Sequence, residues 1–117
     1  KGELLSCADF NHDHERCLSV IKEAVKSSTA RKKVVVTHHV PSFRMQCPKF
    51  VSSKANGAFM VELEGYIKEC GVDYWIYGHS HYNVDMRIGE TWCVSNQLGY
   101  VFHDEHLTFN PGKTFEL

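Results

Sequence analysis

Two short apolar runs, each followed at once by histidines, limit most strongly what this chain can fold into. Val34–His39 reads as three valines and then Thr-His-His, and Val72–His81 is an aromatic and β-branched run that ends in Gly-His-Ser-His. The segment from about Ala58 to Cys70 has apolar residues at helical spacing, and Gly71 is a natural helix stop. A strand, helix, strand order predicts parallel strands joined by a crossover helix, with both carboxyl ends at one edge of the sheet. We therefore expect an α/β fold, with the consecutive valines buried on both faces of the sheet.

The flanking segments predict one more helix and further strands. Asn11–Ser28 has apolar residues at three-and-four spacing, and Asn11 or Asp13 can cap its first turn. Val40–Gly57 lacks periodicity and is expected to be a long loop. Antiparallel strands, with a tight turn at Gly89–Glu90, are expected over Val84–Ile88, Thr91–Ser95, Leu107–Phe109 and Thr114–Leu117.

Composition excludes several classes of partner. The 117 residues are 43% hydrophobic, which suffices for one core, and 13 basic against 14 acidic side chains give a net charge of −1. Because this balance offers no broad basic surface, neither an anionic membrane nor a nucleic acid is expected as partner, except for a nucleotide. The apolar runs are far shorter than the roughly 20 residues of a membrane-spanning helix. Five cysteines without CxxC spacing favour a reducing compartment, so we expect a soluble, cytoplasmic protein.

Eight histidines make the His-x-His spacing a weak signal by itself. About half of one such pattern is expected by chance, and the chain has it at His12/His14 and at His79/His81. The strand context is more informative, because His38 follows the first predicted strand and the second pair follows the other. Neutral imidazole is a good ligand for zinc, manganese, iron or nickel. We therefore predict that His38, His79 and His81 bind metal. Ordinary surface or turn positions are expected for His12, His14, His103 and His106.

Gly78 and His39 complete the predicted site. A glycine lets the backbone turn sharply off the strand, so that His79 and His81 can both face the sheet edge. Neighbours in an extended segment point to opposite sides, so only one of His38 and His39 can face the same metal. His39 is then a candidate for holding substrate or orienting a ligand. Packing against the loop is its alternative role.

Two segments together resemble the calcineurin-like metallophosphoesterase family. They are VVVTHHVPS, Val34–Ser42, and IYGHSH, Ile76–His81. The later segments CVSNQLGYV, Cys93–Val101, and FNPGKTFEL, Phe109–Leu117, look like the strand segments that follow the GHxH loop in this family. The resemblance implies a four-layer αββα sandwich, of which this chain would form the C-terminal portion.

The resemblance also implies an activity and a role for each histidine. His38 and His79 would bind the second metal of a dinuclear centre, His81 would reach the first, and His39 would stand beside the substrate. The family hydrolyses phosphomonoesters or phosphodiesters with a metal-bridging hydroxide, so two divalent ions (Mn, Fe, Zn or Ni) are the implied cofactors. A phosphoester small molecule or a phosphoprotein is the implied substrate.

The sequence departs from the family before its first predicted strand. None of the DxH, GDxxD and GNHE or GNHD motifs, which supply the metal-binding carboxylates of the family, precedes Val34. We therefore expect residues 1–117 to be a C-terminal fragment of one metallophosphoesterase domain, inactive alone and prone to self-association. Two alternatives stay open. One is a non-catalytic interaction module on the same fold, and the other is a mononuclear zinc-binding domain built on the three predicted ligands.

Overall fold

The computed structural model describes residue 4 and residues 6–52 and 60–117. The chain divides into a first unit that ends at Arg31 and a second unit from Lys32 to Leu117. Each unit is described by itself below.

The described part of the first unit contains the helix α1, Cys7–Ser27, which begins earlier than its apolar pattern predicts. The Ser6 hydroxyl accepts a hydrogen bond from the Asp9 backbone N–H at 3.1 Å, and the Asp9 carboxylate accepts one from the Ser6 N–H at 3.1 Å. This reciprocal capping box satisfies donors that the first turn leaves without partners, so Ser6 is the cap and the predicted caps Asn11 and Asp13 are wrong. No helix within the described residues is both long and apolar enough to cross a membrane.

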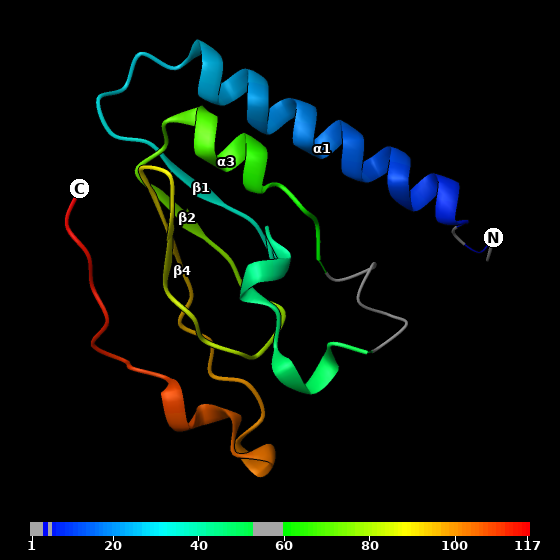
Figure 1. Ribbon diagram of the computed structural model, residues 1–117, viewed down its shortest axis with the longest axis vertical. Coiled ribbons are helices and arrows are strands. Elements are labelled where there is room, and N and C mark those ends of the chain that lie inside the picture. The colour runs from blue at the N-terminus through cyan, green and yellow to red at the C-terminus, as the bar shows by residue number, and fades with distance from the viewer. Residues whose placement is uncertain (1–3, 5, 53–59) are drawn as a thin grey trace. The chain divides into compact units, whose positions relative to one another are not determined.

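The second unit is built on a mixed sheet, which confirms the α/β class. Within the described residues the sheet has four strands in the order β1-β2-β4-β3: β1 Val34–Val36, β2 Tyr74–Ile76, β4 Thr91–Val94 and β3 Met86–Ile88. β2 is parallel to both β1 and β4, whereas β3 and β4 are antiparallel. Figure 1 labels β1, β2 and β4, which lie side by side. The predicted parallel pair and the turn at Gly89–Glu90 are both confirmed.

The core of the unit lies on one face of this sheet. Val35, Trp75 and Cys93 are in register on neighbouring strands and are all buried. The helix α3, Glu64–Cys70, contributes the fully buried Ile67. The Thr91 hydroxyl, also fully buried, donates to the carbonyl of Val72 at 2.7 Å, so this polar group is satisfied inside the core.

The opposite face of β1 is exposed, so the prediction that its valines are buried on both faces is wrong. Val34 and Val36 keep 38% and 69% of their surface, while Val35 between them keeps 8%. Within the described residues β1 is an edge strand, and alternate side chains of a strand point to opposite faces. Only one face of this edge is covered by the core of the unit.

The helix α3 begins later than predicted. Of the predicted first turn, Ala58 and Phe59 lie outside the described residues, and Met60–Leu63 is not helical. Val61 donates its N–H to the carbonyl of Val40 at 3.0 Å, so the chain here pairs with the segment after β1 before it enters the helix at Glu64. The predicted stop is confirmed, because Gly71 takes the left-handed conformation with φ 71°.

The C-terminal strands predicted over Leu107–Phe109 and Thr114–Leu117 are wrong. Residues Glu105–Thr108 form a 3₁₀ helix, and residues 113–117 have no regular structure. The side-chain amide of Asn96 donates to the carbonyl of Asn110 at 2.7 Å and accepts from its N–H at 2.9 Å. A side chain therefore occupies backbone groups that a strand ladder would use.

Candidate metal centre

Backbone hydrogen bonds beyond the strand ends bring the two histidine segments together. Thr37 donates its N–H to the carbonyl of Ile76 at 2.9 Å, and Gly78 donates its N–H to the carbonyl of His38 at 3.0 Å. The parallel pairing of β1 and β2 thus continues past both strands. It places His38 beside His79 at the carboxyl edge of the sheet, where open α/β folds bind ligands.

Three imidazoles, which we call the histidine cluster, meet at this edge: His38, His39 and His79. One ring nitrogen from each lies within 4.8 Å of the others, and the ring centroids are 4.8 to 5.0 Å apart. His38 Nε2 and His79 Nδ1 form a hydrogen bond of 2.8 Å. The cluster is partly open to solvent, because His38 is exposed and the other two are half-buried.

His39 joins this cluster against the expectation that it points away from His38. The chain does not stay extended after β1 but bends at residues 38 and 39. The Thr37 hydroxyl donates to the carbonyl of His39 at 3.0 Å and fixes this bend. The alternation of side chains that holds in a strand therefore does not apply here.

The electrostatics of the cluster favour an uncharged His79. Burial lowers the pKa of this imidazole below its usual value, and the neighbouring His39, His38 and His81 lower it further because like charges repel. A neutral imidazole is the form that binds a metal ion. The position of His79 thus favours the form of the ring that can bind an ion.

The turn after β2 is formed by the histidines themselves and not by Gly78. His79 and His81 have φ angles of 66° and 52°, in the left-handed region that non-glycine residues seldom adopt, whereas Gly78 is not among the residues with positive φ. A Cβ at Gly78 would lie 3.6 Å from the carbonyl oxygen of His38, which is an ordinary contact. The predicted role of Gly78 is therefore wrong, and the unusual backbone lies at the predicted ligands.

His81 lies outside the histidine cluster but close enough for its charge to affect the pKa of His79. Its Nδ1 is 3.1 Å from Oε1 of Glu105, and its backbone N–H donates to the side-chain carbonyl of Gln97 at 2.7 Å. Glu105 and Gln97 were not predicted from the sequence, since both lie in segments without periodicity and reach His81 only through the tertiary fold.

The remaining histidines lie elsewhere. His12 is exposed and His14 half-buried on α1 in the first unit. His103 is exposed within a 3₁₀ turn. His106 is half-buried in the next such turn, and its Nδ1 has no hydrogen-bond partner among the described residues. The turn positions predicted for the last two are confirmed.

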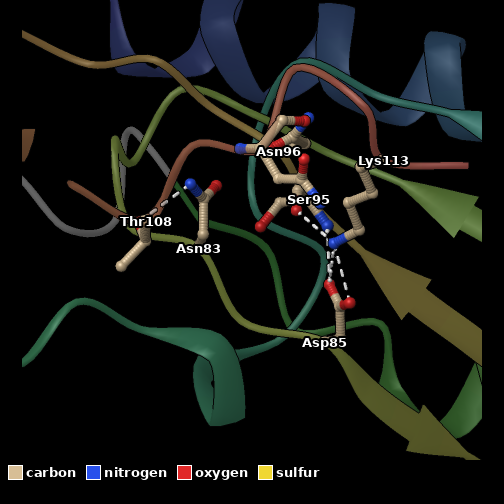
Figure 2. Close-up of a pocket in the computed structure, with 7 residues that line it drawn as sticks. Asn83, Asp85, Ser95, Asn96, Thr108 and Lys113 are labelled. Atoms are coloured by element: carbon tan, nitrogen blue, oxygen red, sulfur yellow. Dashed lines mark hydrogen bonds and ion pairs between the residues drawn. The ribbon is translucent and has the colours of Figure 1, made fainter. Parts of the chain in front are cut away.

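Polar side chains tie the C-terminal segment to the strands that carry the site; we call them the C-terminal clamp. It consists of Asn83, Asp85, Asn96 and Lys113 with their partners. Asn83 donates to the Gln97 carbonyl at 2.9 Å and to the Thr108 hydroxyl at 3.0 Å, and it accepts from the Gln97 N–H at 2.6 Å. Lys113 Nζ lies 2.7 Å from both carboxylate oxygens of Asp85 (Figure 2).

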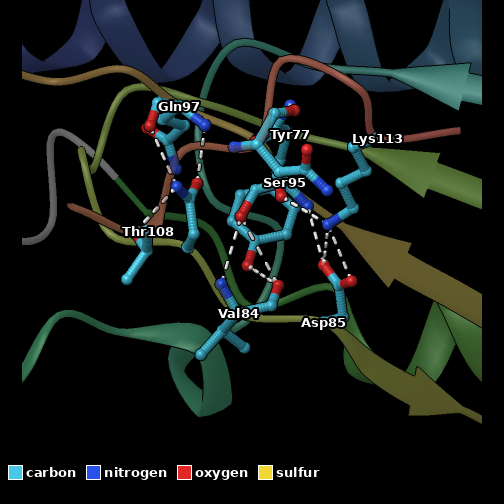
Figure 3. Close-up of polar contacts among 10 residues, drawn as sticks. Tyr77, Val84, Asp85, Ser95, Gln97, Thr108 and Lys113 are labelled. Carbon is cyan, nitrogen blue, oxygen red and sulfur yellow. Dashed lines mark hydrogen bonds and ion pairs between the residues drawn. The ribbon is translucent and has the colours of Figure 1, made fainter. Parts of the chain in front are cut away.

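The residues of the C-terminal clamp line an open polar pocket together with Ser95, Thr108 and Asn110. Figure 3 shows that the polar contacts extend from these residues to Tyr77, Val84 and Gln97. Lys113 also donates to the carbonyl of Ser95 at 2.8 Å, and the Tyr77 hydroxyl donates to the carbonyl of Val84 at 2.7 Å. The polar groups that line the pocket are hydrogen-bonded to one another. We therefore interpret the pocket as a structural contact between the C-terminal segment and the strands. The strand predicted over Val84–Ile88 begins only at Met86. Val84 and Asp85 bond instead to Ser95, through the Val84 N–H and the Asp85 carboxylate.

The donor set of the histidine cluster suits a borderline divalent ion. Metal–imidazole bonds of about 2.0 to 2.1 Å in a tetrahedral site separate two ligand nitrogens by about 3.4 Å. One ring nitrogen from each histidine of the cluster lies within 4.8 Å of the others, which is comparable to that spacing. Within the described residues the cluster contains imidazoles alone, without a carboxylate or thiolate.

The chain is similar to a viral protein at low sequence identity. No family model matches the chain, and no solved structure matches it. An uncharacterized protein of Acanthamoeba polyphaga mimivirus is 28% identical over 110 residues, which cover 88% of this chain and 38% of the viral protein. The chain is thus similar to well under half the length of that relative.

Proposed function

We propose that this chain is the histidine-bearing part of a metal-dependent phosphoesterase. His38 and His79 hold a divalent transition-metal ion, His81 is a further ligand, and His39 stands beside the substrate. The observation that carries the proposal is the meeting of three imidazoles at the carboxyl ends of two adjacent parallel strands. The HHxP and GHxH motifs of these two segments support phosphoester chemistry in particular.

The residues of the cluster divide the work between holding the ion and holding the substrate. A divalent ion supplies Lewis acidity toward a phosphoryl oxygen and toward the attacking water. His38 and His79 bind the ion through ring nitrogens, and His38 Nε2 and His79 Nδ1 are 2.8 Å apart. His39 contacts a phosphate oxygen by donating a hydrogen bond, and its place beside both other rings keeps it within reach of the same phosphate.

A centre with two ions needs anionic ligands in addition. Three neutral imidazoles leave the charge of even one divalent ion uncompensated, and bridging two ions is a task for carboxylates. In the two-ion form of the proposal these carboxylates come from outside the histidine cluster. The substrates are then phosphoesters, either small molecules or phosphoproteins.

A second candidate is a self-contained mononuclear zinc site. It is favoured by the all-imidazole composition of the cluster among the described residues, because three histidines with an open position are a ligand set of catalytic zinc. In this form the ion binds without any further carboxylate. The two forms differ in stoichiometry and in the activity of the chain alone.

The test uses the chain loaded with cobalt(II), whose visible spectrum reports its ligands. We expect inorganic phosphate to change the spectrum of the loaded chain, whereas chloride at equal ionic strength leaves it unchanged. Hydrolysis of p-nitrophenyl phosphate by the chain with one zinc ion would support the mononuclear form. Binding of phosphate without hydrolysis would support the form that needs further carboxylates. A cobalt spectrum that is insensitive to phosphate would contradict both and favour a non-catalytic module.

A further inference from the structure

We propose that Glu105 is a positioning residue for His81. It holds the Nδ1 proton of the ring, so that Nε2 is the nitrogen presented to a metal ion. The inference deepens the proposed function and rests on it for the role of the metal. The tautomer of His81, however, is a property of the chain without any ion.

The contact between the two side chains defines the direction of the hydrogen bond. His81 Nδ1 and Glu105 Oε1 are 3.1 Å apart, and the two side chains keep only 33% and 15% of their surface. An ionised carboxylate accepts hydrogen bonds and cannot donate them, so Nδ1 must carry the proton. In the neutral imidazole, Nε2 is then the nitrogen with the free lone pair.

The carboxylate is itself held in place. Its Oε1 also accepts the backbone N–H of Tyr100 at 2.7 Å, and this bond is the main reason that the pKa of Glu105 lies below its usual value. The Tyr100 N–H therefore keeps Oε1 in place beside the imidazole. The Tyr100 ring packs edge-on against His81 with centroids 4.8 Å apart, so one residue restrains both partners.

Gly99 shows how tightly this arrangement is built. Its φ of 67° lies in the left-handed region, and an added Cβ would lie 2.5 Å from the Cβ of Glu105 and 3.3 Å from the Cβ of His81. A side chain at this position would push Glu105 away from the imidazole. The backbone lies this close to both residues only because Gly99 has no side chain.

The loop of residues 80–82, which contains His81, is held by the Gln97 side chain. The Gln97 side chain accepts from the His81 N–H and donates to Ser80 Oγ and to the Tyr82 carbonyl, both at 3.1 Å. Asn83 of the C-terminal clamp binds Gln97 and Thr108, and Thr108 belongs to the same 3₁₀ turn as Glu105. The clamp thus keeps the segment that carries Glu105 against the loop that carries His81.

This arrangement matters for metal binding because a histidine ligand is oriented by the partner of its other nitrogen. A carboxylate in that position selects the tautomer and raises the basicity of the coordinating nitrogen. Removing such partners weakens metal binding by about 10- to 100-fold. Glu105 is expected to act on this scale.

The experiment compares three variants with the wild-type chain. Glu105→Ala removes the acceptor, and Glu105→Gln keeps an acceptor oxygen of the same reach without the charge. Glu90→Ala is the matched control, because Glu90 is an exposed glutamate whose ion pair is with Arg87 on the β3–β4 hairpin. Two quantities are measured: the tautomer of His81 in the metal-free chain, by two-bond ¹H–¹⁵N NMR at about pH 8 where imidazole is neutral, and the dissociation constant for cobalt(II).

We expect an Nδ1-protonated His81 in the wild type and the control, and a mixed or reversed tautomer in Glu105→Ala with cobalt affinity about 10- to 100-fold lower. Glu105→Gln should restore the tautomer and part of the affinity, which also serves if the alanine variant does not fold. An Nε2-protonated His81 in the wild type, or Glu105→Ala equal to wild type in both quantities, would overturn the inference. If no variant binds cobalt, the proposed function fails, while the NMR result still decides the role of Glu105.

Discussion

Thr37 forms hydrogen bonds both to the core of the second unit and to the histidine cluster. Its hydroxyl accepts a hydrogen bond from Nε1 of the fully buried Trp75 at 3.0 Å and donates one to the carbonyl of His39 at 3.0 Å. One side chain therefore satisfies a buried donor and fixes the bend that places His39. Stability and site geometry are coupled at this position.

Thr37→Val removes both hydrogen bonds with little change in shape. Leaving the indole N–H without its partner costs about 1 to 3 kcal/mol, and the bend at His39 loses its hydroxyl donor. Urea unfolding followed by tryptophan fluorescence should give a lower midpoint for this variant, together with weaker metal binding. Thr37→Ser keeps the hydroxyl and is the matched control. A valine variant as stable as the serine variant would contradict this account of Thr37.

At the scale of single residues the sequence predicts part of the histidine cluster. His38 and His79 could be predicted because each follows a strand, and parallel strands bring their carboxyl ends together. His39 could not, since its position depends on a bend that a single hydroxyl fixes. Glu105 could not either, because its partner His81 is 24 residues away in an irregular segment.

The elements of the second unit are fastened at the end of the sheet opposite the histidines. Asp73 lies just before β2 and Lys33 just before β1. The Asp73 carboxylate accepts a hydrogen bond from the Lys33 backbone N–H at 2.9 Å, and the Lys33 carbonyl accepts one from the Asp73 N–H at 2.9 Å. The bond from Lys33 is the main reason that the pKa of Asp73 lies below its usual value, with Lys32 adding a favourable charge. The parallel pairing of β1 and β2 thus begins at an ionised carboxylate.

Asp73→Asn should lower the urea midpoint at pH 7, and the difference from wild type should shrink with acidification. Because the folded pKa is depressed, the stabilisation is present above the unfolded value of about 3.9 and is lost as the pH falls through the lower folded value. Asp13→Asn on α1, an exposed aspartate, is the control. A difference that stays constant from pH 7 to about pH 3 would contradict the assignment.

At the scale of elements, the strands with a clear apolar pattern were predicted well. The C-terminal segments, which are held by side-chain hydrogen bonds, were not. β1 agrees with its three valines, and the turn between β3 and β4 lies at the predicted pair of residues. The C-terminal segment fails because the Asn96 side chain bonds the backbone of Asn110 and so replaces a ladder. Such bonds between distant residues leave no trace in periodicity.

For the molecule as a whole, the second unit leaves an apolar sheet face open at an edge strand. Val34, Val36 and Trp92 on this face are 38%, 69% and 41% exposed. Exposed apolar surface beside an unpaired strand edge favours association between chains. We infer that the chain self-associates through this face at high concentration.

Val36→Lys should weaken that association, because a charge on an edge strand opposes pairing and burial. Val20→Lys is the matched control, since Val20 on α1 is 65% exposed against 69% for Val36. Sedimentation velocity over a range of concentrations measures the effect. A wild-type chain that remains monomeric at every concentration would contradict the prediction. So would a Val20→Lys variant whose self-association is weakened as much as that of Val36→Lys.

The central claim is that the histidine cluster binds a metal ion, and calorimetric titration of zinc into the chain tests it most directly. We expect zinc to bind, and we expect His79→Ala to weaken this binding by at least about 100-fold, which exceeds the effect of losing an outer partner. His14→Ala, a histidine on α1 in the first unit, should leave the affinity unchanged. A wild-type chain that binds no zinc, or a His79→Ala variant that binds it as tightly as wild type, would contradict the claim.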